Sequence, residues 1–533
     1  MCIRDSCIYP GVCGYSKTTD AKLKLGVELM KYIDYVQLNP FQKFWYNLKK
    51  FFVNLPSNLG KVFGAIGRFF KKIFVGIGKG FAGYFSRFIK GDWATKLSYI
   101  IMGFGNVVRG QVIKGFIFLA TEVLFVLYMI GFGWNKIYNL GFFNGGTIGF
   151  NEEGWGKLPN GRMGRIEGDD SMKLLLYGVM TLVIIAIFFA VYIANTKSAY
   201  KTQQMKAAGE KLPHFGDEIK EFFDSKFHVT LLAFPTLTIS IFTILPLLFM
   251  ILIAFTNYDH SHIGTLFSWV GLETFGRVFS NTGAASMGKT FVELVKWTLI
   301  WAVLATVLNY ILGMVVALMI NKKGIKLKAL WRTLFVVTVA VPQFVSLLLM
   351  SQMLDVNGGA INVLLHDVLH WTPQYINFLG GDPWVARVTV VVVNIWVGIP
   401  YTILITSGIL MNIPADLYES ATIDGAGPVK SFFKITLPYM LFVTTPYLIT
   451  SFVGNINNFN VIYLLTSNLQ NSNDLYQAGY TDLLVTWLFK LTMNSQDYNF
   501  AAAIGILVFI VCATVSLLTF NLTKSAKNEE EFS

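Results

Sequence analysis

Eight long runs of apolar residues restrict the fold of this 533-residue chain more than any other feature. A bilayer core needs roughly 20 mainly apolar residues per helix, and each run reaches that length. Charged residues make up only 14% of the chain and the mean hydropathy is +0.54, whereas soluble proteins usually contain about 25% charged residues. We therefore expect an all-α integral membrane protein with about eight transmembrane helices, some of them tilted or kinked. The runs lie at about 112–131, 173–194, 229–255, 291–320, 329–354, 384–411, 436–466 and 501–523.

Lysine and arginine are unevenly distributed among the connections between these runs, which predicts the orientation of the chain. Connections rich in positive charge stay in the cytoplasm. In one alternate set, 355–383 has no Lys or Arg, 256–287 has only Arg277 and 467–500 has only Lys490. The first outer loop, 132–172, carries more charge and weakens the contrast. We expect both termini in the cytoplasm, together with Lys197, Lys201, Lys206, Lys211, Lys220, Lys226, Lys322, Lys323, Lys326, Lys328, Arg332, Lys430, Lys434, Lys524 and Lys527.

Charge and cysteine usage exclude several other classes of protein. The net charge of +12 lies mostly beside the apolar runs, where anionic lipid attracts it, so we expect membrane lipids and no nucleic acid as partners. No CxxC spacing or histidine partner accompanies the four cysteines, so we expect no metal, no cofactor and no disulfide framework. The opening residues lack the three parts of a removable signal peptide. The cysteines are Cys2, Cys7, Cys13 and Cys512.

The N-terminal segment, residues 40–95, differs in character from the rest of the chain. Aromatic and aliphatic residues recur there at helical spacing, and basic residues fall off that stripe. This pattern predicts an amphipathic helix on the inner membrane face. A docking face for a partner subunit or for the protein's own loops is the alternative, since apolar stripes serve both uses. The stripe is Phe70, Phe74, Ile77, Phe81, Tyr84 and Phe88, and the basic residues are Lys71, Lys72, Lys79, Arg87 and Lys90.

Two further features could carry function. Glu122 lies inside the first apolar run, where an acid is either part of a functional pathway or hydrogen-bonded to a neighbouring helix. The stretch GAASMGKT, Gly283 to Thr290, fits the pattern of a phosphate-binding P-loop. A P-loop follows a buried strand, but GLETFGRVFSNT is no buried strand, and the site would lie outside the cell. We therefore interpret this stretch as a loop and the start of a helix.

A polar, glycine-bearing segment, ESATIDGAGPVKSFFKITLP, separates two of the apolar runs. Pro414 suits a first helical turn, and Asp416 and Glu419 suit its positive end. Gly425, which follows Asp424, can adopt the left-handed conformation that ends a helix sharply. The pattern predicts a short cytoplasmic helix, a glycine turn and a second amphipathic piece that re-enters the membrane at Pro438. An ordinary loop with helical content is the alternative.

This segment resembles the EAA loop of ABC-importer membrane subunits, E-A-A-x-x-D-G-A followed by I-x-L-P. Ser420 replaces the first alanine, and Ile435, Leu437 and Pro438 match the downstream part. In that family the loop is a coupling helix that sits in a cleft of the ATPase subunit. The resemblance implies the type I ABC importer permease fold, without an ATPase site of its own. The implied coupling residues are Glu419, Ala421, Asp424, Gly425 and Ala426.

Later segments narrow the resemblance. SFVGNINNFNVIYLLT, AGYTDLLVTWLFKLT and NFAAAIGILVFIV resemble the maltose/maltodextrin (MalF-like) permeases, most densely over 394–523 and not at all over 1–95. The resemblance implies a sugar site within the membrane, and uncharged amide and aromatic side chains suit a neutral oligosaccharide. The alternative is that these asparagines only join helices. The implied sugar-binding residues are Asn394, Gly398, Tyr401, Ser451, Asn455 and Asn458.

Together these features predict a permease that imports a neutral oligosaccharide, expected to be maltose or maltodextrin, across a bacterial cell membrane. The expected partners are a second homologous permease, two ATPase subunits and an extracellular sugar-binding lipoprotein. A permease for another sugar and an ion-coupled secondary transporter are the alternatives. The expected divisions are an N-terminal extension, 1–95, two helices with their loops, 96–228, a permease core, 229–523, containing the coupling loop 414–438, and a tail, 524–533.

Overall fold

The computed structural model describes residues 80–522 except for 152–153, 158–162, 167, 214, 225–226, 281–285, 323, 467–468 and 470–471, together with scattered residues between 60 and 79. By its internal contacts the chain divides into two units, 1–79 and 80–533. Every element described below belongs to the second unit. Most of the predicted N-terminal extension, including Phe70, Phe74 and Ile77, lies outside the described residues.

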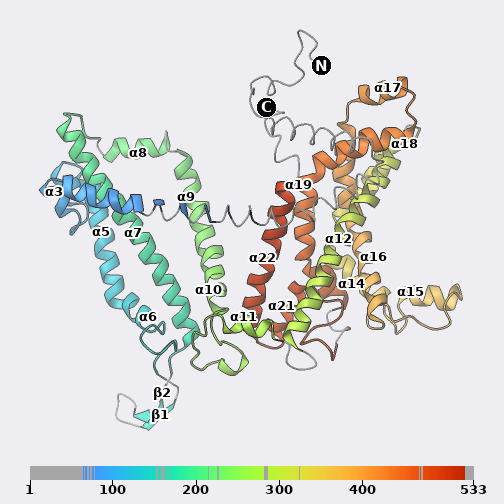
Figure 1. The fold of residues 1–533 in the computed structure, drawn as a ribbon, viewed down its shortest axis with the longest axis horizontal. Helices are drawn as coiled ribbons and strands as arrows, with labels where there is room; N and C mark the ends of the chain where they lie inside the picture. Colours follow the sequence, from blue (N-terminus) through green and yellow to red (C-terminus); the bar gives the residue numbers. More distant parts are fainter. Residues whose placement is uncertain are drawn as a thin grey trace, which may run out of the picture. The chain divides into compact units, whose positions relative to one another are not determined.

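The first half of the second unit pairs two long helices (Figure 1). After a helical stretch that ends at residue 90, the chain forms α3 (Trp93–Leu97), α4 (Phe104–Val108), α5 (Val112–Tyr128), a π-helical turn (Met129–Gly133) and α6 (Trp134–Tyr138). A two-stranded antiparallel hairpin follows, β1 (Gly154–Lys157) and β2 (Met163–Ile166), with Gly154 opposite Ile166. The next helices are α7 (Ser171–Ala207), α8 (Phe215–Phe223) and α9 (Phe227–Ile239), then a π-helical turn (Ser240–Ile244) and α10 (Leu245–Ile253).

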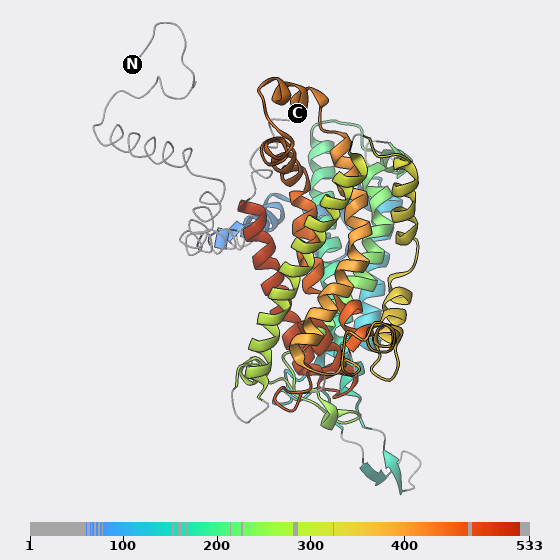
Figure 2. The ribbon, with the colours of Figure 1, turned by 90° about the vertical axis from the view of Figure 1, so that its right-hand side faces the viewer.

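The second half contains the remaining long helices, and α12, α16 and α19 run alongside one another (Figures 1 and 2). Its first elements are a short 3₁₀ turn (His260–His262), α11 (Glu273–Val278), α12 (Met287–Asn321), α13 (Lys328–Val339), α14 (Gln343–Met353), α15 (Ala360–Asn362) and a π-helical turn (Val363–Val368). They are followed by α16 (Pro383–Met411), α17 (Ala415–Ile423), α18 (Pro428–Ser431), a π-helical turn (Phe432–Thr436), α19 (Leu437–Ile456), α20 (Phe459–Thr466), α21 (Leu484–Met493) and α22 (Tyr498–Leu522).

The helices confirm an all-α membrane fold. Among the described residues, seven helical segments are long and apolar enough to cross a membrane, and a bent pair brings the number to eight. Each corresponds to one predicted run. The segments are Val112–Tyr138, Ser171–Ala207, Thr230–Ile253, Met287–Asn321, Pro383–Met411, Pro428–Thr466 and Tyr498–Leu517, and the bent pair is α13 with α14.

Two of the predicted runs are not continuous helices. The run at 329–354 bends by 86° between α13 and α14, because Pro342 disfavours the helical conformation at the preceding residue and provides no N–H group. The run at 436–466 is interrupted after Ile456, where Asn457 forms the C-cap of α19 and α20 begins only at Phe459. Asn455 and Asn458 therefore do not share one uninterrupted helix.

Glu122 has a structural partner. Its carboxylate Oε2 accepts a hydrogen bond of 2.8 Å from the backbone N–H of Met102, in the turn between α3 and α4. In the same turn the amide of Asn195 on α7 accepts from the N–H of Gly103 and donates to the carbonyl of Ser98. These bonds satisfy backbone groups that helices leave free at their ends. Of the two interpretations of Glu122, the hydrogen-bonded one is observed.

The core around α12 is built from buried aromatic and small residues. Trp301 and Trp487 are both fully buried. Near the N-terminal end of α12, a buried ion pair of 2.7 Å between Lys490 and Asp482 fixes α21, and Leu484 donates its N–H to Thr298 of α12. This half of α12 is thereby held between α21 and α16.

Candidate functional site

The segment that resembles an EAA loop folds as a short helix with a glycine stop. Helix α17 begins after Pro414, its N-cap, and carries Asp416 in its first turn. At the other end Gly425 has a φ of +70°, the left-handed conformation expected from the sequence. The N–H of Gly425 bonds to the carbonyl of Thr422, and that of Ala426 bonds to the carbonyl of Ala421. This pair of bonds is a Schellman motif, so the prediction of a helix ended by a glycine turn is confirmed.

The short helix presents an exposed surface. Glu419 and Asp424 are exposed, while Ala421 and Ala426 are half-buried. Ile423 is 86% exposed and Val429 is 72% exposed. Val429 belongs to the apolar segment Pro428–Thr466, but Ile423 lies between two spans, where an apolar side chain this exposed is typical of a surface that another protein covers.

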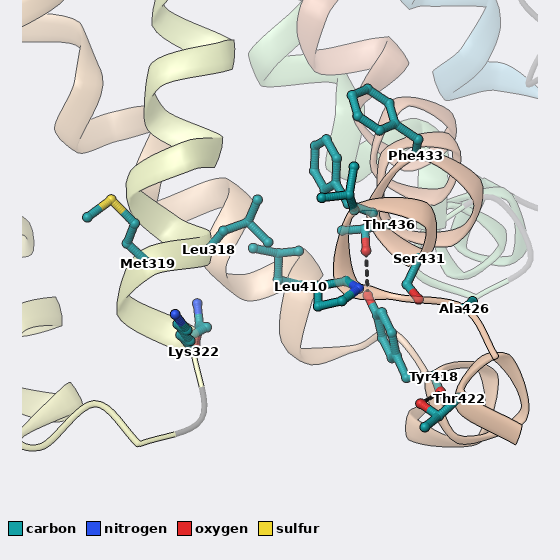
Figure 3. Close-up of a pocket in the computed structure, with 14 residues that line it drawn as sticks. Leu318, Met319, Lys322, Leu410, Tyr418, Thr422, Ala426, Ser431, Phe433 and Thr436 are labelled. Atoms are coloured by element: carbon teal, nitrogen blue, oxygen red, sulfur yellow. Dashed lines mark hydrogen bonds between the residues drawn. The ribbon is translucent and has the colours of Figure 1, made fainter. Parts of the chain in front are cut away.

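A hydrogen bond connects this helix to the membrane helices, and a groove lies beside that bond (Figure 3). The hydroxyl of Tyr418 lies 2.8 Å from that of Thr436, in the π-helical turn that leads into α19. Beside this bond is a groove of about 900 Å³ between the ends of α12 and α16 and the segment 418–436. The Tyr418–Thr436 bond thus links α17 to the turn that precedes α19.

Helices α12 and α16 pack in parallel and in register. Near the N-terminal ends of the two helices, the Arg387 guanidinium lies 4.6 Å from the ring centre of Trp297. Further along, Gly398 contacts Asn309, and Gly313 contacts Thr402. A Cβ on Gly398 would lie only 2.4 Å from Nδ2 of Asn309, so the glycine permits this close approach. In all three pairs the residue numbers on α12 and α16 differ by nearly the same amount, so the two helices keep one register. Asn394 lies one turn before Gly398 and is therefore level with the turn of α12 that precedes Asn309.

Helix α19 contacts the same level of α12 through polar groups. The Asn455 amide donates a 3.0 Å hydrogen bond to the hydroxyl of Thr306, and Tyr310 and Thr444 bond at 2.8 Å. Asn458 donates to Oδ1 of Asn455 at 3.4 Å. Three helices thus bring amide and hydroxyl groups to one level of the bundle. We call this set the polar layer: Thr306, Asn309, Asn394, Gly398, Asn455 and Asn458.

Two buried atoms of the polar layer have no hydrogen-bond partner in the part of the chain that the structure describes. They are the acceptor Oδ1 of Asn309 and the donor Nδ2 of Asn394. A buried polar group without a partner costs roughly 1–3 kcal/mol, so such groups are uncommon in a purely structural interface. A ligand that carries hydroxyl groups can satisfy both, since a hydroxyl donates and accepts.

The remaining sequence-predicted residues lie at the margin of this layer. Tyr401, one turn after Gly398 on α16, is 41% exposed. Ser451, one turn before Asn455 on α19, is half-buried. The structure thus brings Asn455 and Asn458 together, and it places Asn394 and Gly398 at the same level on the neighbouring helix. Within the described part of the chain, neither Tyr401 nor Ser451 is hydrogen-bonded to a member of the layer.

Sequence reasoning missed Thr306 and Asn309. A signal was available, because Asn309 is a lone amide within the apolar run 291–320, and amides inside membrane spans are costly unless they serve a purpose. The P-loop-like stretch, in contrast, behaves as predicted where it is described. Helix α11 precedes it in place of a strand, and Ser286 caps α12 by accepting from the N–H of Lys289.

A bundle of apolar helices defines a multi-pass membrane protein, here with a short exposed helix between two of its spans. Residues 309–527 match the family model described as "Binding-protein-dependent transport system inner membrane component". The galactooligosaccharides transport system permease protein GanP of Bacillus subtilis (strain 168) is 33% identical over 443 residues, 81% of this chain and 97% of GanP. The maltodextrin transport system permease protein MdxF of the same organism is 33% identical over 440 residues, 81% of this chain and 95% of MdxF.

The chain belongs to this family, the membrane permeases of ABC importers, which confirms the resemblance found in the sequence. Among solved structures, a bacterial ABC transporter involved in the import of the acidic polysaccharide alginate aligns with a TM-score of 0.46 and 21% identity. The alignment covers 57% of this chain and 97% of that one.

Proposed function

We propose that this permease carries a neutral oligosaccharide, maltose or a maltodextrin, through the polar layer by alternating access. The observation that carries the proposal is the pair of unpartnered buried atoms, Oδ1 of Asn309 and Nδ2 of Asn394, beside the close contact at Gly398. None of the side chains in the polar layer carries a charge, which suits hydroxyl groups better than a carboxylate. The maltodextrin permease MdxF among the relatives supports the same substrate class.

The hydrogen bonds of Asn455 admit the structural interpretation as well. Its amide joins α19 to α12 through Thr306, as an asparagine that only connects helices would. In our proposal the Asn455 side chain has two uses, because its Oδ1 accepts only a long hydrogen bond, 3.4 Å, from Asn458 and can also accept from a sugar hydroxyl. Tyr401 would then provide a ring face at the edge of the layer for a sugar to stack on.

Transport requires partners, which we infer to be a second homologous permease, two ATPase subunits and an extracellular sugar-binding lipoprotein. The exposed surface of α17 and α18 supports an ATPase cleft as its site of docking, with Glu419, Ala421, Asp424, Gly425 and Ala426 as the coupling residues. ATP hydrolysis would be performed by those partners. The division into an extension, 1–95, two additional helices, 96–228, and a permease core, 229–523, remains part of the proposal.

For orientation we propose a multi-pass protein of a bacterial cell membrane with both termini in the cytoplasm. Lys206 and Lys326 would then be cytoplasmic, and Asp382 and Asn473 external. Labelling of single cysteines at these four positions with an impermeant reagent in intact cells tests the map. Labelling at 382 and 473 alone supports it, and labelling at 326 contradicts it.

A second candidate substrate is a galactose-containing oligosaccharide, because the relative GanP is a galactooligosaccharides permease. The experiment that separates the two reconstitutes the whole transporter in lipid and measures ATPase stimulation by each loaded binding protein. Stimulation by maltodextrins alone supports the first proposal, and stimulation by galactooligosaccharides alone supports the second. Absence of stimulation by either contradicts both.

A further inference from the structure

The helical stretch of residues 80–90, which we call the 80–90 helix, is fastened to α7 along one side (Figure 1, blue segment next to α3). The hydroxyls of Tyr84 and Tyr192 lie 3.1 Å apart, and Tyr99 donates a 3.0 Å hydrogen bond to the carbonyl of Tyr84. Tyr192 in turn donates to the carbonyl of Tyr99 at 2.8 Å. Three tyrosines from three segments thus hold the helix against α7.

Tyr192, to which the 80–90 helix is attached, lies at a depth in the membrane that can be estimated from its position along α7. Tyr192 is 21 residues beyond Ser171, the first residue of α7, which corresponds to roughly 32 Å along the helix axis. The hydrocarbon core is about 30 Å thick, so a span that starts near Ser171 leaves the core close to Tyr192. In the proposed orientation this is the inner, cytoplasmic interface.

A second side of the 80–90 helix is apolar and exposed. Phe81 is 62% exposed, Phe85 58% and Ile89 73%, and their spacing of four residues places them on one face. Trp93, at the start of α3, is 66% exposed. Tryptophan is enriched where a membrane meets water, and such a face is typical of a helix in the interface.

The third side is polar and basic. Ser86 and Lys90 are exposed and lie on the helix side opposite Phe81 and Phe85. The sequence GFAGYFSRFIKG, residues 80–91, contains no acidic residue. The acid that follows, Asp92, forms an ion pair with the buried Arg109 and is therefore not available to neutralise these cations.

We propose that the 80–90 helix is a binding surface for anionic phospholipid of the inner leaflet. Phe81, Phe85 and Ile89 enter the acyl region, and Lys90 and Lys96 contact the headgroups. The depth of the tyrosine attachment and the sorting of the three sides favour lipid over a protein partner. A partner subunit would need neither this depth nor a separate basic side.

The test uses the whole transporter reconstituted in vesicles, with Cys2, Cys7, Cys13 and Cys512 replaced by serine. Spin labels are placed one at a time at positions 85, 86, 89 and 90. One set of vesicles contains phosphatidylglycerol and the other only phosphatidylcholine. We expect labels at 85 and 89 to collide with oxygen, which concentrates in lipid, and labels at 86 and 90 to collide with a water-soluble nickel chelate.

Lipid selectivity is measured with a dye at position 85 and brominated lipids as quenchers. We expect brominated phosphatidylglycerol to quench more than brominated phosphatidylcholine, and Lys90→Glu to lower that ratio at least five-fold, since the loss of one basic residue alone removes ~1 kcal/mol of attraction to an anionic surface and the new carboxylate adds repulsion. The matched control is Lys173→Glu, the same charge reversal at the outer end of α7, which should leave the ratio unchanged.

Three results would overturn the proposal. Access of the nickel chelate to 85 and 89 equal to that at 86 and 90 would place the apolar side in water. Shielding of 85 from both oxygen and nickel would indicate a protein partner. Equal quenching by the two brominated lipids would remove the anionic selectivity.

Discussion

Two buried asparagines, Asn195 on α7 and Asn394 on α16, have opposite surroundings. Both polar atoms of the Asn195 side chain are hydrogen-bonded, since Oδ1 accepts from the N–H of Gly103 and Nδ2 donates to the carbonyl of Ser98. Nδ2 of Asn394 is buried without a partner. Fully paired amides fix a structure, whereas an unpaired one stores a cost that a ligand can remove. In our proposal, the paired amide of Asn195 serves stability, whereas the unpaired amide atoms of Asn309 and Asn394 serve sugar binding.

The α5–α7 pair and the α12–α16 pair also differ in how closely their helices pack. In the first span, Val112–Tyr138, 6% of the apolar window is buried, compared with 39% for α12. Helices α5 and α7 meet through stacked rings, with Phe125 and Phe188 at 3.7 Å. Helices α12 and α16 meet through Gly398 and Gly313, where a Cβ would collide with the neighbouring side chain. Small residues allow the two helices to approach closely, and the amide of Asn309 then lies at the interface between them.

The largest effect is expected at α17, the proposed coupling helix, which belongs to the half of the molecule that we propose carries transport. Gly425→Val should abolish uptake while the protein still inserts and assembles, because a β-branched residue at φ +70° costs on the order of 1–3 kcal/mol and reshapes the helix end. Gly427→Val is the matched control, because Gly427 has a φ of −72° and open space around it. Uptake and complex assembly are measured together. Normal uptake by the Gly425 variant would reduce this segment to an ordinary loop.

At the polar layer, Gly398→Ala should reduce sugar affinity about five- to a hundred-fold, as expected for 1–3 kcal/mol. The new Cβ would displace the Asn309 amide, 2.4 Å away in the present structure. Adding Asn309→Ala should recover the melting temperature without recovering affinity. Recovery of both by the double variant would mean that Asn309 fills space and does not contact the sugar.

On the other side of the comparison, Asn195→Leu should lower the melting temperature and leave sugar affinity unchanged. The substitution leaves the N–H of Gly103 and the carbonyl of Ser98 buried without partners, at roughly 1–3 kcal/mol each. Thermal unfolding and binding are measured on the same purified complex. A selective loss of affinity would place the α5–α7 pair in the transport pathway.

The smallest effect concerns pH. Burial raises the pKa of Asp92, but hydrogen bonds from Arg109 and Thr95 outweigh it and leave the pKa below its ordinary 3.8. A carboxyl with a depressed pKa stabilises the fold above its unfolded value and loses that contribution as pH falls through the folded value. The stability difference between the protein and Asp92→Asn should therefore be constant near neutrality and shrink below about pH 4.

Asp170→Asn is the comparison variant, since Asp170 also caps a helix but pairs with Lys173, whose side chain is 71% exposed. The effect of Asp92→Asn should be larger, because its partner Arg109 is 2% exposed and an exposed ion pair contributes little. Equal losses of stability in Asp92→Asn and Asp170→Asn at neutral pH would mean that the ion pair with the buried Arg109 adds nothing to stability.

Much of the fold could be predicted from the sequence, because hydropathy determines which runs must lie in the membrane. The glycine stop at Gly425 was predictable for a local reason, since few other residues adopt its backbone conformation. The bend at Pro342 was also signalled by the sequence, because a proline inside an apolar run disfavours a continuous helix, but a count of apolar residues ignores it. The partner of Glu122 had none, because a backbone N–H in a turn depends on the tertiary fold.

The candidate site was predictable only in part. Asn394, Gly398, Asn455 and Asn458 came from a family resemblance, and the structure places them at one level of the bundle. Asn309 and its contact with Gly398 depend on the register of α12 against α16, which a single sequence does not contain. Asn457 lies in the polar stretch GNINNFN, residues 454–460, which signals a weak point in the run, but the exact position of the interruption depends on the tertiary fold.

The central claim is that the polar layer binds sugar in addition to joining helices. It is tested most directly by measuring sugar affinity and melting temperature on the same purified complexes of Asn455→Leu, Asn458→Leu, Asn394→Leu and Tyr401→Ala. We expect affinity to fall about five- to a hundred-fold in each, as for the loss of one buried hydroxyl partner, with basal ATPase activity retained. Unchanged affinity in all four, with lowered melting temperatures, would contradict the claim and make these residues part of the scaffold.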